Sequence, residues 1–203
     1  AYQPIRSLAT INLVAYQGAA AFKRILSVID KKIEIQDNKN FPDLIMKESE
    51  INFNNVSFRY ESTNEQAIKN ISFNIQGNTM AAFVGHSGAG KSTIINLLPR
   101  FYDPTDGKIE IDNQNIKKVS LKSLRKNLSM VSQDVILFDD TIKNNILYAK
   151  ESASDEEIKK ACDYAAASEF IEKLPKKYET VIGENGIRLS GGQKKRISIA
   201  RAV

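Results

Sequence analysis

A glycine-rich loop between two apolar segments constrains this chain more than any other feature. Residues 80–84 are apolar and have the composition of a strand buried on both faces. Residues 94–98 have the spacing of an amphipathic helix. The loop between them follows the pattern Gly85-x-x-x-x-Gly90-Lys91-Ser92. A strand, a glycine loop and a helix in this order predict a phosphate-binding loop.

The residue types in this loop suit the binding of a polyphosphate. Gly88 and Gly90 lack a Cβ atom, so the backbone can adopt positive φ and direct several N–H groups at one anion. The positive end of the helix dipole favours the same position. We expect Lys91 to reach the β- and γ-phosphates and the Ser92 hydroxyl to ligate Mg²⁺. The alternative, a turn that merely ends in Lys-Ser, is disfavoured by the flanking strand and helix. The sequence therefore predicts a nucleoside triphosphate site with these contact residues: Gly85, His86, Ser87, Gly88, Ala89, Gly90, Lys91, Ser92 and Thr93.

Composition excludes some classes and leaves others open. The chain has 203 residues, of which 42% are hydrophobic and 26% charged, as in a globular protein. Cys162 is the only cysteine, which excludes an internal disulfide. The net charge of +5 is a weak indication of a nucleic-acid or lipid partner, because the lysines are scattered along the chain. No stretch has the roughly eighteen uninterrupted apolar residues of a membrane span.

The amino-terminal segment predicts one long helix. In residues 4–30 the apolar and small residues alternate at spacings of three and four, which favours a helix with one narrow packing seam. The seam consists of Leu8, Ile11, Ala15, Gly18, Phe22, Ile25 and Ile29. An ordinary surface helix and one helix of a bundle with partners outside this chain both fit the pattern. Residues 37–42 are polar and without periodicity, and we place the domain boundary near Glu48.

Residues 49–84 predict β structure. Ile51 and Phe53 lie at odd-numbered positions, whereas the apolar residues 56, 58 and 60 lie at even-numbered positions. Because alternate residues of a strand face opposite sides, we expect a bulge or break near residues 54–55. Residues 71–75 alternate cleanly, and a turn at residues 77–78 precedes the expected strand at 80–84. Tyr60 closes the first strand, and by position alone an aromatic residue there is a core or cross-strand partner.

The second half of the chain predicts two short strands and several helices. We expect strands at residues 108–111 and 128–131, and helices at 141–148, 154–167 and 168–174. Gln133 closely follows the second strand, at the end where α/β sheets bind ligands, but the spacing alone favours a capping or loop glutamine. Pro99 is expected to end or kink the helix that follows the phosphate loop.

A second candidate anion site lies near the end of the chain. The run Leu189-Ser190-Gly191-Gly192-Gln193 leads into a helical segment. Two glycines at a helix start offer backbone N–H groups and a positive dipole end to an anion. Two such sites in one chain are unusual.

With these motifs together, the chain resembles the nucleotide-binding domain of ATP-binding cassette transporters, in particular bacterial homodimeric exporters of the lipid A and multidrug type. The resemblance extends over essentially the whole chain. It implies an α/β P-loop NTPase cassette with a mixed-sheet core, an antiparallel β subdomain and a helical subdomain, preceded by a long amphipathic helix. The implied domains are residues 1–36, the cytoplasmic end of a last transmembrane helix with a linker helix; residues 37–48, a linker; and residues 49–203, the nucleotide-binding domain.

The resemblance also implies roles for individual residues. Tyr60 matches the aromatic residue that stacks on adenine, and Gln133 matches the glutamine that senses Mg²⁺ and the γ-phosphate. Lys91 and Gln133 are then the catalytic residues, and Ser92 and Gln133 the metal ligands. The implied nucleotide contacts are the nine residues of the phosphate loop together with Tyr60, Gln133, Ser190, Gly191, Gly192 and Gln193. Residues 180–186 look like the exporter loop that meets the membrane domain.

The implied partners are a second copy of the cassette, arranged head to tail, and a transmembrane domain of the same polypeptide, at the cytoplasmic face of the inner membrane. No nucleic acid is expected. In the family, the pattern continues into a Walker B aspartate, a catalytic glutamate and a switch histidine. The chain ends at Val203 and its only histidine is His86, so these 203 residues are expected to bind ATP and to be inactive alone. Lys195 stands where many members have glutamine.

Two other functions stay open at this point. One is a soluble cassette ATPase that acts on ribosomes or nucleic acid, which the basic charge mildly favours. The other is a non-hydrolysing ATP-binding fragment, which only the missing carboxy-terminal motifs support. Substrate contacts of an exporter would lie in membrane helices outside this chain.

Overall fold

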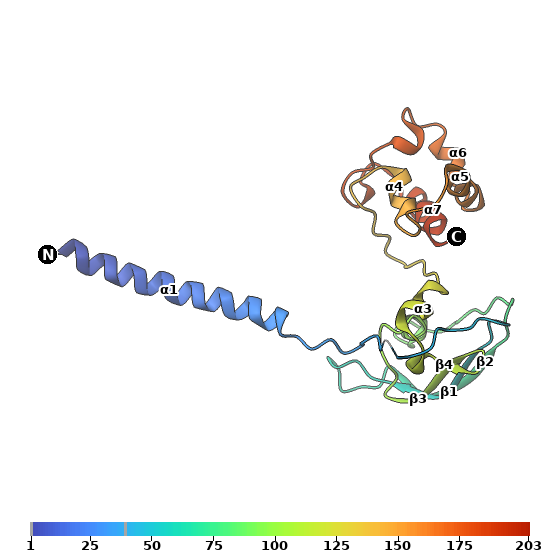
Figure 1. The fold of residues 1–203 in the computed structure, drawn as a ribbon, viewed down its shortest axis with the longest axis horizontal. Helices are drawn as coiled ribbons and strands as arrows, with labels where there is room; N and C mark the ends of the chain where they lie inside the picture. Colours follow the sequence, from blue (N-terminus) through green and yellow to red (C-terminus); the bar gives the residue numbers. More distant parts are fainter. Residues whose placement is uncertain (1, 39) are drawn as a thin grey trace. The chain divides into compact units, whose positions relative to one another are not determined.

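The computed structural model describes the backbone of residues 2–38 and 40–203, and the side chains within these ranges except those of residues 2–10 and 13. The chain divides into two compact units, Ala1–Leu121 and Lys122–Val203. The first contains a long helix and an antiparallel sheet, and the second is helical (Figure 1). The predicted boundaries after residue 36, between helix and linker, and after residue 48, between linker and nucleotide-binding domain, stay predictions.

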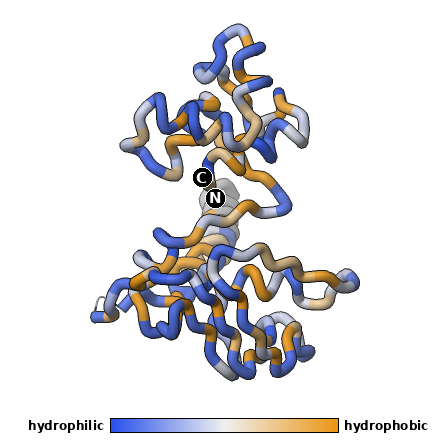
Figure 2. The backbone as a smooth tube through the Cα atoms, turned by 90° about the vertical axis from the view of Figure 1, so that its right-hand side faces the viewer, coloured by the Kyte–Doolittle hydropathy of each residue, from blue (hydrophilic) through white to orange (hydrophobic). Residues whose placement is uncertain are grey.

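The amino-terminal segment forms the expected helix, α1 (Tyr2–Ile29). Ile11, Phe22, Ile25 and Ile29 are all more than half exposed, so the predicted seam has no packing partner among the described residues. The Leu8 side chain lies outside the described residues. Elsewhere in the chain, hydrophobic and hydrophilic stretches are interspersed along the backbone trace (Figure 2). Of the helices that the structure describes, none is both long and apolar enough to cross a membrane.

The sheet of the first unit has four antiparallel strands in the order β2-β1-β3-β4 (Figure 1). The strands are β1 (Ile51–Phe58), β2 (Ile68–Ile75), β3 (Asp106–Ile111) and β4 (Gln114–Asn115). The pairing of β1 shifts register between Phe53 and Val56, and Asn55 has a φ of 49°. The predicted bulge near residues 54–55 is therefore confirmed. The alternation in β2 and the turn at residues 77–78 are also as predicted.

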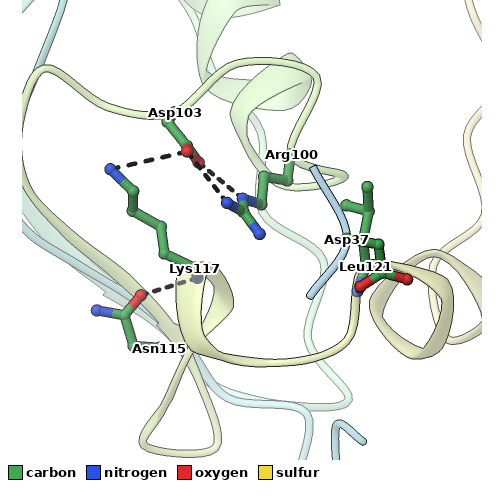
Figure 3. Close-up of polar contacts among 6 residues, drawn as sticks. All are labelled: Asp37, Arg100, Asp103, Asn115, Lys117 and Leu121. Atoms are coloured by element: carbon green, nitrogen blue, oxygen red, sulfur yellow. Dashed lines mark hydrogen bonds and ion pairs between the residues drawn. The ribbon is translucent and has the colours of Figure 1, made fainter. Parts of the chain in front are cut away.

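Polar contacts fasten the segment that precedes β1 to the rest of the first unit. The Asp37 carboxylate accepts the backbone N–H of Leu121 at 2.8 Å (Figure 3). Asp112 accepts backbone N–H groups from Lys47, Ser49 and Glu50 at 2.7, 3.1 and 2.9 Å. These hydrogen bonds hold the pKa of Asp112 below its ordinary value, and the bond from Lys47 has the largest effect. The connecting segment is thus an ordered part of this unit.

A second polar cluster follows the helix α2 (Lys91–Leu97). Arg100 donates two hydrogen bonds to the Asp103 carboxylate, at 2.8 and 3.2 Å, and Lys117 lies 3.8 Å from the same group (Figure 3). Lys117 belongs to the short helix η1 (Ile116–Lys118), which Asn115 caps. The end of α2 at Leu97, two residues before Pro99, confirms the expected effect of the proline.

Two predicted strands are absent. Neither residues 80–84 nor residues 128–131 form a strand, and Met80 and Val84 are 99% and 93% exposed. An apolar run becomes a strand only where neighbouring strands satisfy its backbone N–H and C=O groups. The described residues provide no such neighbour for either run. The prediction of Gln133 at a strand end is therefore wrong for this structure.

In the second unit, α4 and α5 pack against α7 (Gly191–Ala202). The other helices are α3 (Leu121–Lys126, which spans the unit boundary), α4 (Ile142–Leu147), α5 (Asp155–Tyr164), α6 (Ser168–Ile171), η2 (Lys177–Glu179) and η3 (Glu184–Gly186). The core joins Ile197 of α7 to Ile142, Cys162, Ile171 and Ile182, all of which are fully buried. The three predicted helices of this region are confirmed with shorter bounds, and Figure 1 shows α4 and α5 beside α7.

Removal of the α5 cap is expected to destabilise the second unit. Ser154 and Glu157 form a reciprocal capping box, in which the Ser154 hydroxyl accepts the Glu157 N–H and the Glu157 carboxylate accepts the Ser154 N–H. We expect Ser154→Ala to lower the free energy of unfolding by about 1 kcal/mol. Denaturant unfolding measures this loss. Ser152→Ala, an exposed change two residues earlier, is the control, and equal stability of the two variants would contradict the prediction.

Candidate nucleotide site

The glycine loop has the backbone geometry that the motif predicts. Gly88 and Gly90 have φ values of +80° and +84°, and Gly90 caps the start of α2. A Cβ atom at Gly90 would lie 2.7 Å from the carbonyl oxygen of Ala67, so only glycine fits there. Within the loop, the Ala89 N–H donates to the His86 carbonyl at 3.2 Å. The positive φ expected of both glycines is confirmed.

The Lys91 ammonium lies over this loop. Its Nζ atom donates to the carbonyl oxygens of Gly85 at 2.9 Å and His86 at 2.6 Å. The side chain thus folds back along the loop from the first turn of α2, which places a positive charge beside the glycine backbone. A loop of backbone N–H groups with an ammonium at its edge is suited to several adjacent negative oxygens.

Tyr60 is joined to α2 through a hydrogen bond. Its hydroxyl lies 3.0 Å from the hydroxyl of the buried Thr93, whereas the neighbouring Ser92 is exposed. The Tyr60 ring meets the edges of Phe58 and Tyr102, with centroid distances of 4.8 and 5.2 Å. The hydrogen bond connects the predicted base-binding aromatic residue to the helix that begins at the phosphate loop.

A cleft of about 580 Å³ lies beside Tyr60, and its walls include Phe58, Arg59 and Tyr102. An aromatic wall of this kind is suited to a flat base, although no residue of the phosphate loop lines the cleft. Sequence reasoning missed Tyr102 as a site candidate. The only signal was the aromatic pair at residues 101–102 before the turn, and the pairing with Tyr60 depends on a contact across 42 residues.

The second glycine motif begins α7 with a capping box. The Ser190 hydroxyl accepts the Gln193 N–H at 3.3 Å, and the Gln193 amide oxygen accepts the Ser190 N–H at 2.9 Å. Gly191 and Gly192 are exposed, and a Cβ atom on either would meet no heavy atom within 4 Å. The box engages two of the donors at the helix start, while the two glycines leave their backbone open to a ligand.

Gln133 belongs to an exposed segment of the second unit. Residues 129–134 are all exposed, and the Ser132 hydroxyl donates to the Asp134 carbonyl at 2.5 Å. The Lys195 ammonium, from α7, donates to the Ser132 carbonyl at 2.6 Å. The structure thus brings the Gln133 segment together with the helix of the second motif. Lys91, Ser92, Thr93 and Tyr60 are grouped within the first unit.

The described side chains contain no group of three or more His, Cys, Asp or Glu residues that could hold a metal ion. The candidate ligands Ser92 and Gln133 are both exposed and supply neutral oxygens. Mg²⁺ prefers oxygen ligands and is commonly held by one or two protein groups together with substrate phosphates. A hydroxyl oxygen such as that of Ser92 is a suitable ligand for a metal that arrives with a nucleotide.

Comparisons with known proteins agree with this geometry. A family profile described as "ABC transporter" matches residues 68–203. The ATP-dependent lipid A-core flippase of Syntrophus aciditrophicus (strain SB) is 45% identical over 202 residues, which cover 100% of this chain and 33% of the relative. The protein of the same name from Coxiella burnetii (strain RSA 493 / Nine Mile phase I) is 46% identical over 202 residues, with coverage of 99% and 34%.

A solved structure described as a bacterial Atm1-family ABC exporter with ATP bound superposes with a TM-score of 0.85 at 43% identity, and covers 92% of this chain and 32% of that chain. The chain spans about a third of the length of the curated relatives it matches. The profile covers both glycine motifs, and the identity of the relatives extends over the whole chain. This chain belongs to the ABC transporter family.

Proposed function

We propose that this chain is the ATP-binding cassette of an exporter that uses ATP hydrolysis to move lipids or hydrophobic compounds across a membrane. The observation that carries the proposal is the presence of two helix-start anion motifs, the loop at residues 85–92 and the run at residues 189–193, on two separate units. The names of the relatives, ATP-dependent lipid A-core flippases, support the lipid as substrate class.

ATP is held first by the phosphate loop. The backbone N–H groups of residues 88–92 surround the terminal phosphates, and the Lys91 ammonium exchanges its carbonyl contacts for phosphate oxygens. The adenine stacks against Tyr60, with Tyr102 extending the aromatic wall. The Tyr60–Thr93 bond keeps the base platform and the phosphate loop in one arrangement.

Mg²⁺ is proposed to bind at Ser92 and Gln133. When bound, it neutralises the charge that develops on the phosphate oxygens. Ser92 offers its hydroxyl directly after Lys91, and Gln133 offers an amide oxygen that none of the described hydrogen bonds engages.

A second copy of the cassette is the proposed partner, arranged head to tail. The phosphate loop of one copy faces Ser190 and Gly192 of the other, and each nucleotide is held by both. Loss of the γ-phosphate removes a shared contact, so the copies separate and shift the attached transmembrane domain between two states. The exposed seam of α1 is the proposed connection to that domain, at the cytoplasmic face of the inner membrane.

The test of this function uses the full-length protein in lipid vesicles. We expect ATP hydrolysis that lipid A-core stimulates, together with transfer of the lipid between leaflets. Gly192→Asp is expected to lower hydrolysis by at least about 100-fold and to keep ATP binding, because a carboxylate would repel the γ-phosphate held by the opposite copy.

Ser152→Asp is the matched control, since it adds the same charge on an exposed loop of the same unit. Hydrolysis by Gly192→Asp at the rate of the unaltered protein would contradict the head-to-tail arrangement. Hydrolysis that no lipid stimulates, in a protein that copurifies with ribosomes or nucleic acid, would favour the soluble ATPase instead.

A further inference from the structure

The segment that carries Gln133 has little apolar anchoring of its own. Every side chain from residue 129 to residue 134 is exposed, and Ile136 is 67% exposed. The first buried side chain after it is Leu137, at 2%. A groove of about 300 Å³ lies between this segment and α7. Val135, two residues after Gln133, is partly buried against the core of the unit, whereas residues 129–134 themselves have only polar contacts to hold them.

Two cations of α7 supply such contacts. Lys195 donates to the carbonyl oxygen of Ser132 at 2.6 Å, and Arg201 donates from Nη1 to the carbonyl oxygen of Ile136 at 3.1 Å. The two carbonyls are on either side of Gln133 in sequence. Charge-assisted hydrogen bonds of this kind are roughly twice as strong as neutral ones. The helix thus contacts the backbone on both sides of Gln133.

Arg201 is itself fixed by further contacts. Its Nε and Nη2 atoms donate to the backbone and side-chain oxygens of Asn145 at 2.8 and 2.9 Å. Its guanidinium lies 5.7 Å from the Phe138 ring centroid and 5.9 Å from that of Tyr148. Arg201 therefore has a structural role in the core of the unit, which makes Lys195 the better residue for a test.

We propose that Lys195 is a positioning residue that fastens the Gln133 segment to the helix of the second glycine motif. This inference rests on the proposed function and adds to it a specific connection within the second unit. The bond engages the backbone of Ser132, so the Gln133 side chain stays available for the nucleotide. Lys195 forms no ion pair with the described acidic residues, and its ammonium donates instead to the Ser132 carbonyl. Gln133 and Ser190–Gly192 consequently move as one body when the two copies close.

The test follows the mobility of the segment and the kinetics in the same full-length protein. A spin label on Asp134→Cys reports motion next to Gln133, because the Asp134 side chain is exposed. Cys162 does not interfere, since it is buried and burial raises its pKa to about 11. Any cysteine outside these 203 residues is replaced by serine in the background. The variants are Lys195→Met and Lys195→Arg. Arg196→Met is the matched control, because it removes an equivalent bond from α7 to the backbone of Ala166, at 2.9 Å.

We expect Lys195→Met to shorten the rotational correlation time of the label and to lower kcat about tenfold, the effect of one charge-assisted hydrogen bond. The Kd for ATP is expected to stay within about twofold, because Lys91 and the glycine loop are unchanged. Lys195→Arg restores both quantities, and Arg196→Met leaves both unchanged.

Unchanged label mobility in Lys195→Met would overturn the proposed connection, whatever the ATPase rate. Increased mobility with an unchanged kcat would overturn the positioning role. A protein without ATPase activity would refute the proposed function, and the label would still show whether Lys195 fastens the segment.

Discussion

Lys91→Ala is expected to lower kcat for ATP hydrolysis by at least about 100-fold in the full-length protein. The reason is the position of the ammonium, which lies within 2.9 Å of two carbonyl oxygens of the glycine loop. In the proposed function, a positive charge fixed there would lie beside the terminal phosphates of the bound nucleotide, where negative charge builds up in the transition state. Alanine removes this charge and leaves the loop backbone intact. Steady-state ATPase assays measure the loss of kcat, and titration with a fluorescent nucleotide measures the Kd.

Two further variants separate charge from geometry. Lys91→Arg keeps the positive charge, but its planar guanidinium cannot reproduce an ammonium that contacts two carbonyls on a tight loop, so we expect most of the activity to be lost. Lys118→Ala removes an exposed lysine of the same unit and is expected to leave kcat unchanged. Substantial hydrolysis by Lys91→Ala would show that the loop does not hold the reacting phosphates.

Local patterns account for the parts of the structure that the sequence predicts well. The expected helix after residue 154 is one such part, because its capping box joins Ser154 to a residue three positions later and its chemistry is visible in a short window. The glycine loop is equally local, because the positive φ of Gly88 and Gly90 follows from the turn that the motif makes. The change from odd-numbered to even-numbered apolar positions after Phe53 likewise locates the bulge in β1.

Contacts between distant residues account for what the sequence does not predict. The runs at 80–84 and 128–131 are apolar enough for buried strands, but strand formation depends on partners elsewhere in the chain. The Lys195–Ser132 bond joins residues 63 positions apart, and the Tyr60–Thr93 bond joins residues 33 apart. A motif states which residues bind a phosphate. It does not state which side chains hold those residues in place.

Gly107→Ala is expected to destabilise the first unit by roughly 3 kcal/mol or more. Gly107 has a φ of +78°, and a Cβ atom there would lie 2.3 Å from the carbonyl oxygen of Asn55 and 2.4 Å from that of Asn54. Both clashing atoms belong to the backbone, so no side-chain rotation relieves them. Relief would require movement of β1 away from β3, which would disturb the ladder on both sides of the bulge.

This destabilisation follows from the bulge itself. The register between β1 and β3 shifts between Asn54 and Ser57, and the carbonyls of residues 54 and 55 approach β3 where Gly107 lies. Denaturant unfolding of the purified protein measures the loss. Asp106→Ala changes the preceding exposed residue of the same strand and is expected to stay within about 0.5 kcal/mol of the unaltered protein. If Gly107→Ala and Asp106→Ala unfold at the same denaturant concentration, the bulge does not require glycine opposite it, and the close approach of the two strands is wrong.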